Sequence, residues 1–289
     1  MSNPRIPFHL GPPARPLPPP APGKRLIAFV VLNVEHWRFD RPMPRKVLGA
    51  PHGVEHTPDV PNFSWVEYGM RRGLPRIVSS LKELALPVSI SFNASVIEAY
   101  PAAAEMLAST GWEFIGHGLH QQSLHGAKDE RAVIEGCLTA VEALTGSQPR
   151  GWLGPGLQET DQTPDVLSDL GIEYVCDWVV DEVPVWLQAR PKPLVALPYS
   201  LELNDSVVYA VERQSSPEVH RRLLDTLRVF DSAAEAEEVK VVALPLHPHL
   251  LGVPHRFLYL QEMLEVLMAR DDVMFMSGSD ICHWFQAAG

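Results

Sequence analysis

The sequence predicts an α/β fold: a closed or nearly closed barrel of parallel strands surrounded by helices. From Lys24 onward, short apolar runs alternate with amphipathic segments, as in parallel α/β proteins. About seven or eight such units follow one another over roughly 260 residues, which is the size of a β/α barrel. Three of the apolar runs also stop abruptly at an ionisable residue, and in such barrels the chemistry lies at the strand ends.

Each element is expected from its own local pattern. The segment 129–145 places its apolar residues on one stripe, which is typical of a helix lying on a sheet, and Thr163-Pro164 resembles a helix start. The expected strands are residues 26–34, 87–92, 113–117, 149–153, 172–177, 194–198, 239–246 and 272–276. The expected helices are residues 69–85, 100–110, 129–145, 161–170, 216–235, 256–269 and 277–287.

Two segments stand apart from this alternation. Residues 1–24 form a proline-rich N-terminal arm, a composition that favours an extended chain over a packed element. Residues 25–289 are expected to form a single catalytic barrel domain, without an internal repeat or a linker. The stretch 37–66 has little periodicity and is best interpreted as a long loop after the first strand, and loops of that length are usually functional or disordered.

Composition excludes several classes of function. The net charge is −11, and no basic cluster is longer than Arg71-Arg72, so nucleic acid is not an expected partner. No apolar stretch is long enough to span a membrane, and no secretory signal pattern is present. The three cysteines are scattered without a CxxC motif, which favours reduced thiols. We therefore expect a cytoplasmic protein with a small-molecule substrate and no membrane partner.

Three strand ends carry the candidate chemistry. The first strand runs into Asn33-Val34-Glu35-His36-Trp37, and the run Glu113-Phe114-Ile115 ends in Gly116-His117-Gly118. The run before Leu246 ends in His247-Pro248-His249. Each histidine alone could be a core or loop residue, but three such ends with a carboxylate among them predict one site assembled from distant parts of the chain.

Five motifs in this order resemble the polysaccharide deacetylase family. They are Asn33-Val34-Glu35, Glu113 to Gly118, Gly151-Trp152-Leu153-Gly154-Pro155-Gly156, Tyr174-Val175-Cys176-Asp177-Trp178 and Leu246-His247-Pro248. The resemblance covers about residues 25–287 and implies a distorted (β/α)7–8 barrel that hydrolyses amide C–N bonds. Tyr68-Gly69-Met70-Arg71 and Pro198-Tyr199-Ser200 resemble the allantoinase-like branch of the family.

The chain departs from this family at the positions that would hold a metal. The resemblance implies Asp-x-Asp at the first motif, where this chain has Asn33 and Glu35. It also implies His-x-x-x-His, but Gln121 occupies the second place, and Leu153 replaces an expected arginine. Glu35 and His117 remain as the ligands of any metal, whereas zinc normally takes three protein ligands. We therefore expect no cofactor, with zinc, cobalt or nickel as the alternative.

Amide hydrolysis without a metal assigns a role to each candidate. Glu35 would act as the base if burial raises its pKa, and His117 and His247 would donate protons or hydrogen bonds. Asp177 would orient one of the histidines. Asn33 could hold a carbonyl or a water, and the Arg71 guanidinium suits a carboxylate or ureido group. The expected substrate-binding residues are Asn33, Arg71, Gln121, Trp152, Pro155 and Trp178.

Structural roles compete with these assignments. Glu35 could pair with an arginine at the barrel rim, and Asp177-Trp178 could cap a turn and fill the core. The glycines around Pro155 suit a turn. The remaining histidines are interpreted as surface or supporting groups, with His283 on the last helix structural; the others are His52, His56, His249 and His255.

Three functions follow from these patterns. The first is a hydrolase of non-peptide C–N bonds acting on a small amide, ureide or cyclic amide. The second is a metal-dependent N- or O-deacetylase acting on a sugar-derived substrate. The third is a barrel that has lost catalysis and binds a carbohydrate or ureide, a reading supported by Asn33, Gln121 and Leu153. The sequence leaves open, for all three functions, whether the protein forms a homo-oligomer.

Overall fold

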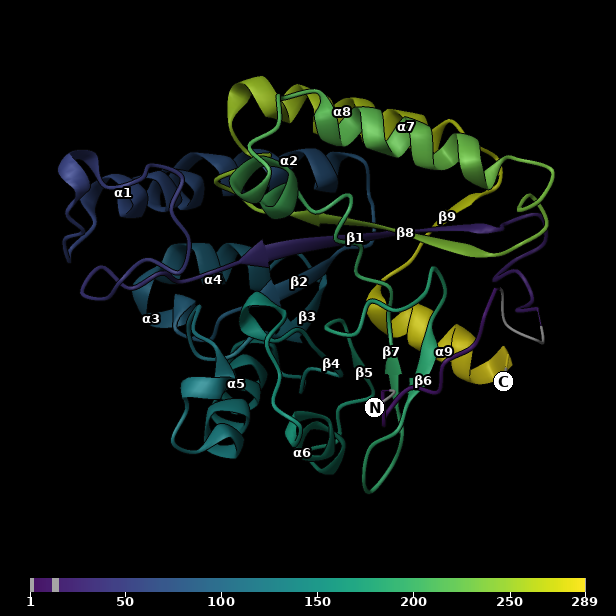
Figure 1. The fold of residues 1–289 in the computed structure, drawn as a ribbon, viewed down its shortest axis with the longest axis horizontal. Helices are drawn as coiled ribbons and strands as arrows, with labels where there is room; N and C mark the ends of the chain where they lie inside the picture. Colours follow the sequence, from purple (N-terminus) through teal and green to yellow (C-terminus); the bar gives the residue numbers. More distant parts are fainter. Residues whose placement is uncertain (1–2, 12–15, 289) are drawn as a thin grey trace.

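The computed structural model describes residues 3–11 and 16–288, which contain one nine-stranded sheet (Figure 1). The order of its strands is β6-β7-β5-β4-β3-β2-β1-β8, and β9 pairs with β1. The strands are β1 (Leu26–Val34), β2 (Ser89–Phe92), β3 (Glu113–Gly116), β4 (Gly151–Trp152), β5 (Tyr174–Val175), β6 (Val185–Leu187), β7 (Leu194–Ala196), β8 (Lys240–Leu246) and β9 (Val273–Phe275).

The predicted α/β barrel fold is confirmed, in the form of a curled sheet that stays open. Every neighbouring pair of strands is parallel except β6 and β7, and each expected strand segment contains one of the observed parallel strands. The edge strands β6 and β8 do not pair with each other in the described residues. A backbone hydrogen bond of 2.9 Å from Val241 N to the Glu182 carbonyl instead links β8 to the segment before β6.

Most of the helices cover the outer face of the sheet, with α7 and α8 lying side by side (Figure 1). The α-helices are α1 (Val60–Tyr68), α2 (Leu74–Glu83), α3 (Val96–Ala99), α4 (Pro101–Ala108), α5 (Glu130–Thr145), α6 (Thr163–Asp169), α7 (Glu218–Phe230), α8 (Pro254–Met268) and α9 (Gly278–Ala288). Shorter helical turns are η1 (Pro51–Gly53), η2 (Gly69–Gly73), η3 (Leu124–Gly126), η4 (Pro155–Leu157) and η5 (Ser206–Val211). The expected loop 37–66 thus contains most of α1. Asp59 caps the start of this helix, because its carboxylate accepts a hydrogen bond from Asn62 N.

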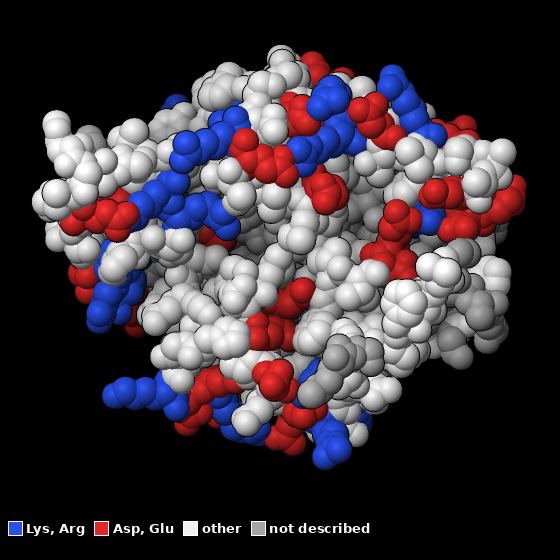
Figure 2. Space-filling model, viewed as in Figure 1, with Lys and Arg blue, Asp and Glu red and all other residues white. Residues whose placement is uncertain are grey.

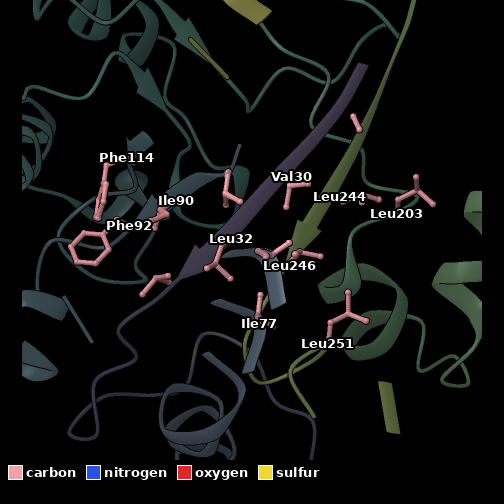
Figure 3. Packing of buried hydrophobic residues seen from close by; sticks show 14 of the residues in the cluster. Val30, Leu32, Ile77, Ile90, Phe92, Phe114, Leu203, Leu244, Leu246 and Leu251 are labelled. Carbon is pink, nitrogen blue, oxygen red and sulfur yellow. The ribbon is translucent and has the colours of Figure 1, made fainter. Parts of the chain in front are cut away.

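Alternation along the strands creates two cores. On β1, Val30 and Leu32 belong to the layer between sheet and helices, which Figure 3 shows with Leu244 and Leu246 of β8. Phe29 and Val31 point the other way, into the barrel interior. Because Asn33 and Glu35 follow at the same period of two, they also face the interior, at the carboxyl end of the strand.

The register of the strands aligns the candidate residues. Val34 pairs with Phe92, and Phe92 pairs with Gly116. Glu35 and His117 therefore follow their strands at the same level. Leu32 pairs with Leu246 on the other side of β1, which brings His247 to the level of Asn33. Residues far apart in the sequence thus meet at one end of the barrel.

The opposite end of the barrel is closed by α9. The Glu113 carboxylate accepts hydrogen bonds from Ser89 Oγ at 2.5 Å, from Tyr174 Oη at 2.8 Å and from Ser279 N at 3.1 Å. Ser279 lies in the first turn of α9, where free backbone N–H groups favour a carboxylate. This partly buried network fixes the C-terminal helix across the amino ends of the strands.

Glycines permit a close contact between the η2 turn and the loop that carries His247. An added Cβ at Gly73 would lie 2.0 Å from the Pro248 carbonyl oxygen, and one at Gly252 would lie 2.6 Å from Gly73 Cα. A Cβ at Gly69 would lie 2.5 Å from the backbone nitrogen of His249. Larger residues would therefore push this loop away from its observed position.

We predict that Gly73→Ala lowers the stability of the protein. The new methyl group would overlap backbone, which cannot move as a side-chain end can, and overpacking of this kind typically costs about 1–3 kcal/mol. Chemical denaturation monitored by tryptophan fluorescence measures the effect. Gly126→Ala is the matched control, because a Cβ there meets nothing within 4 Å. Equal stability of the two variants would contradict the close contact.

The N-terminal arm lies along the body of the protein. Gln188 N donates a 2.9 Å hydrogen bond to the Arg5 carbonyl, and the Ile6 side chain is buried. Further along, Trp284 Nε1 on α9 donates to the Pro18 carbonyl at 3.0 Å.

Acidic and basic side chains are interspersed on the molecular surface that faces the viewer in Figure 2. None of the helices among the described residues combines the length and apolar character needed to cross a membrane.

Candidate active site

A small cavity lies at the carboxyl ends of the strands. Its volume is about 130 Å³, below the ~300–1,000 Å³ of typical drug-sized sites, so it suits a small reacting group. Strand ends and the loops that follow them supply its walls. The lining residues are Asn33, Glu35, Trp37, Pro44, Arg45, His117, Gln121, Leu153, Gly154, Gly156, Leu157, Tyr199, Asn204, Ser206, Val207, His247 and His249.

Glu35 is the centre of this site. Its Oε1 atom lies 3.5 Å from His247 Nε2 and 3.8 Å from His117 Nε2. Its Oε2 atom accepts a 2.6 Å hydrogen bond from Trp37 Nε1, which fixes the plane of the carboxylate. The side chain is 7% exposed, and no arginine pairs with it in the described part of the chain. The predicted convergence of Glu35, His117 and His247 is therefore present.

His247 lies between two carboxylates. Nδ1 is 2.5 Å from Asp205 Oδ1, while Asp205 Oδ2 accepts hydrogen bonds from His247 N at 2.8 Å and Leu251 N at 3.2 Å. Burial alone would lower the pKa of His247, but Asp205 and Glu35 together raise it to about 10. His247 is therefore an imidazolium at neutral pH, with Nε2–H directed at Glu35.

His117 has a different environment. Its Nδ1 lies 2.5 Å from the Leu153 carbonyl, which can only accept, so Nδ1 carries hydrogen. Its buried Nε2 has no hydrogen-bond partner among the described residues and faces Glu35. The Asn93 side chain donates to the His117 carbonyl and accepts from His36 N, which joins the ends of β1 and β3. Nε2 is thus positioned to contact a water or substrate atom.

The expectation for the pKa of Glu35 was wrong in sign. Burial does favour the neutral acid and is the largest single influence. The neighbouring His117 and His247, however, favour the carboxylate strongly enough to hold the pKa of Glu35 well below its ordinary value. Glu35 is consequently ionised over the whole neutral range, and it is a weaker base than an ordinary carboxylate.

Asn33 and Tyr199 form a polar pair on the cavity wall. Asn33 Nδ2 donates to Tyr199 Oη at 2.9 Å and to the Leu246 carbonyl at 3.3 Å. Burial, the largest influence, raises the pKa of Tyr199 well above its ordinary value, so the phenol stays protonated. Gln121 also lines the cavity, and its buried Oε1 has no partner among the described residues. These groups offer hydrogen bonds to a carbonyl or a water.

Asp177 does not orient either histidine, as the sequence had suggested. Its two carboxylate oxygens accept from Gly154 N at 2.9 and 2.8 Å, and Asp205 takes the orienting place beside His247. The reason is alternation along the extended chain: Tyr174 on β5 and Cys176 just after it face the interior, so Asp177 follows on the other face. Burial raises the pKa of Asp177 to about 6. Asp177 thus supports the wall formed by Gly154 without lining the cavity.

Four expected substrate-binding residues lie outside the cavity lining. Arg71 is 73% exposed and pairs with Glu67 at 2.8 Å. Trp152 is fully buried in the layer between sheet and helices, because its neighbour Leu153 takes the inward position. Pro155 is buried beside Gly118, and Trp178 Nε1 donates to Glu159 at 2.6 Å. Strand alternation directs the Trp152 side chain away from the cavity, and the turn at Pro155 does the same for its ring.

His249 had been interpreted as a surface or supporting residue, but it is buried and lines the cavity. Its ring lies 4.5 Å from the centroid of Trp65 and 5.5 Å from that of Trp37, both edge-on. Burial, His247 and other nearby cations lower its pKa to about 3, so it is neutral. Its spacing of two from His247 was the signal that could have placed it on the same wall. Asp205 and Arg45 lie in loops and carried no such signal.

Comparison with known proteins agrees with the motif order. Residues 63–175 match the family model for polysaccharide deacetylase. A Schizosaccharomyces pombe protein whose name assigns it to the polysaccharide deacetylases is 26% identical over 244 residues, 78% of this chain and 76% of the relative. The chain carries a polysaccharide deacetylase domain. A peptidoglycan deacetylase of Helicobacter pylori is 24% identical over 160 residues, covering 55% of this chain and 54% of the relative.

Among solved structures, Puue allantoinase superposes on this polysaccharide deacetylase domain with a TM-score of 0.83. The two chains are 25% identical, and the match covers 95% of each. The predicted family and barrel are therefore confirmed. In its broad reaction class, the chain is a carbon–nitrogen hydrolase.

The metal of many polysaccharide deacetylases does not fit the groups in this site. Across residues 3–11 and 16–288, no three His, Cys, Asp or Glu side chains are placed to hold one ion. Glu35 and His117 face each other, but His247 Nε2 carries a proton at neutral pH and Gln121 offers only an amide oxygen. A zinc site needs three good ligands and an open place. This donor set supplies two.

Proposed function

We propose that this protein hydrolyses a carbon–nitrogen bond in a small amide, ureide or cyclic amide without a metal. The observation that carries the proposal is the row Asp205, His247 and Glu35, in which an imidazolium separates two carboxylates at distances of 2.5 and 3.5 Å. This row places a proton donor and a proton acceptor together in one buried cavity. Acid–base catalysis of amide cleavage needs both.

Glu35 and His247 would divide the proton transfers between them. A water positioned by Glu35 Oε1 and His117 Nε2 gives a proton to Glu35 as its oxygen attacks the carbonyl carbon. The Tyr199 O–H hydrogen-bonds the developing oxyanion, and Asn33 holds the phenol in place by donating to its oxygen. When the C–N bond breaks, His247 Nε2 gives its proton to the leaving nitrogen. The proton on Glu35 then returns to His247 across the 3.5 Å that separates them, which restores both groups.

Asp205 would act through His247 and not on the substrate. Its charge holds the proton on the imidazole between turnovers and fixes the ring by accepting from Nδ1, as carboxylates do in other histidine sites. Asp177 would have a supporting role, since its contacts hold Gly154 in the cavity wall. The supporting comparison is the similarity to Puue allantoinase over nearly the whole length of both chains.

We predict that protein stripped of metals with a chelator keeps its turnover of small amides or ureides. The physical reason is that the site supplies only two good metal ligands, so tight binding is not expected. A screen of such compounds on stripped protein, together with elemental analysis, provides the measurement. Activity lost on chelation and restored by zinc, cobalt or nickel would favour a sugar deacetylase instead. No turnover with either class of substrate, combined with tight ligand binding, would indicate a barrel that has lost catalysis.

A further inference from the structure

Arg45 is a cation at the active-site cavity that the proposed chemistry does not use. It lines the cavity beside Pro44, and its side chain is half-buried. It is close enough to His249 to contribute to the lowered pKa of that group, after burial and His247. In the described chain, no carboxylate lies within ion-pair distance of Arg45. A half-buried guanidinium of this kind is available for a ligand.

The position of Arg45 is fixed by anchors on both sides. Two residues before it, Met43 is buried in a small cluster with Trp37 and Val66. Just after Arg45, the backbone of Val47 and Leu48 is bonded to the buried Asn62 side chain. That side chain accepts hydrogen bonds from Val47 N at 2.9 Å and from Leu48 N at 3.0 Å, and it donates one to the Leu48 carbonyl at 2.9 Å. The loop is therefore held to α1 immediately around Arg45. A preorganised cation loses less freedom when it binds an anion.

The other charges of the site are one imidazolium and two carboxylates. Glu35 faces the His247 imidazolium, and the second carboxylate on His247 comes from Asp205, which lies behind the wall. The neighbouring Lys46 pairs with Glu55 at 2.5 Å, and Arg38 pairs with Asp40 at 2.7 Å. Arg45 thus differs from the cations next to it on the same loop, because no ion pair within the described residues involves it.

From this geometry we propose that Arg45 binds a carboxylate of the substrate, so that the enzyme prefers anionic small amides or ureides over neutral ones. The inference rests on the proposed function and names the substrate class of the same site. The planar guanidinium matches a carboxylate with two parallel hydrogen bonds. The scissile carbonyl would then lie toward Glu35 and His247, and the anionic group toward the loop that carries Arg45.

Two matched probes test the proposal: N-carbamoylglycine, which is anionic, and N-carbamoylglycinamide, its neutral amide. Their dissociation constants are measured by calorimetry on the Glu35→Gln protein, so that binding is recorded without turnover. We expect N-carbamoylglycine to bind more tightly. Arg45→Met, added to this protein, should raise its dissociation constant about tenfold, as loss of a charge-assisted hydrogen bond predicts. The constant for the neutral amide should change by less than about twofold on the same grounds, and Arg45→Lys should be intermediate.

Arg41→Met is the matched control, since Arg41 lies on the same loop but is 67% exposed and outside the cavity lining. It should leave both dissociation constants unchanged. Equal affinity for the two probes, no measurable binding of either, or equal effects of Arg41→Met and Arg45→Met would each overturn the inference. Binding does not depend on turnover. Preferential binding without hydrolysis by the parent protein would therefore sink the proposed function and leave the role of Arg45 standing.

Discussion

Replacing Glu35 with glutamine should lower kcat by about 10²–10⁴-fold, the usual loss when a general base is removed. The substitution keeps the shape of the side chain, and an amide oxygen can still accept from Trp37 Nε1. The fold should therefore survive, with a thermal midpoint near that of the parent. Steady-state kinetics on a responding amide or ureide, paired with a thermal melt, separates loss of chemistry from loss of structure.

The control for this change is Glu105→Gln on the exposed surface of α4, which should leave kcat unaltered. The acidic limb of the parent's pH–rate profile gives a second check. The pKa of Glu35 is held well below its ordinary value. The active carboxylate therefore persists until the pH falls below this lowered pKa. A Glu35→Gln variant with near-normal turnover would show that the base lies elsewhere.

Replacing His247 with glutamine should cost about 10²–10⁴-fold in kcat, since the leaving nitrogen would lose its proton donor. In the parent, the imidazolium is the active form, so the rate should stay level up to high pH and fall as pH rises through about 10. The variant should lose this basic limb. His255→Gln changes an exposed histidine and is the matched control. Unchanged kinetics in His247→Gln would end its assignment as the acid.

Asp205→Asn tests whether that carboxylate acts through His247. Without its charge the pKa of His247 should fall, and the basic limb should move to lower pH while the limb of the parent stays near 10. The same raised pKa makes the folding stability of the parent protein depend on pH. The raised pKa of His247 in the folded state contributes stability that is present below the unfolded value of about 6.5 and is lost as pH rises through about 10. A variant with lower kcat but an unmoved limb would reduce Asp205 to a structural role.

The sequence predicted the barrel well because its signals are local. Buried parallel strands such as Leu26–Val34 and Lys240–Leu246 contain long apolar runs, and ionisable groups follow their ends. The antiparallel strand Val185–Leu187 was missed because it is short and half exposed, which weakens both its length and its pattern. Helix α1 was missed because it lies in a segment with little amphipathic periodicity.

The site was predicted in part for the same physical reason. Glu35, His117 and His247 follow strands, so their position along the barrel could be inferred, whereas Asp205 begins a turn with no strand before it. Side-chain direction was harder, because a shift of one residue moves a group to the other face of the sheet. Trp152 and Asp177 illustrate this: both belong to the right motif, yet each neighbours the residue that points inward. The pKa of Glu35 required knowledge of both imidazoles at once.

The closure of the amino end of the barrel by Glu113 and α9 has a consequence for how substrate and products use the cavity. With that end covered and the interior filled by side chains such as Phe29 and Val31, the cavity lies at the opposite, carboxyl end, where the loop that carries Arg45 forms part of its wall. Substrate and products must occupy this same small space one after another. A bound product therefore takes the place that the next substrate molecule needs.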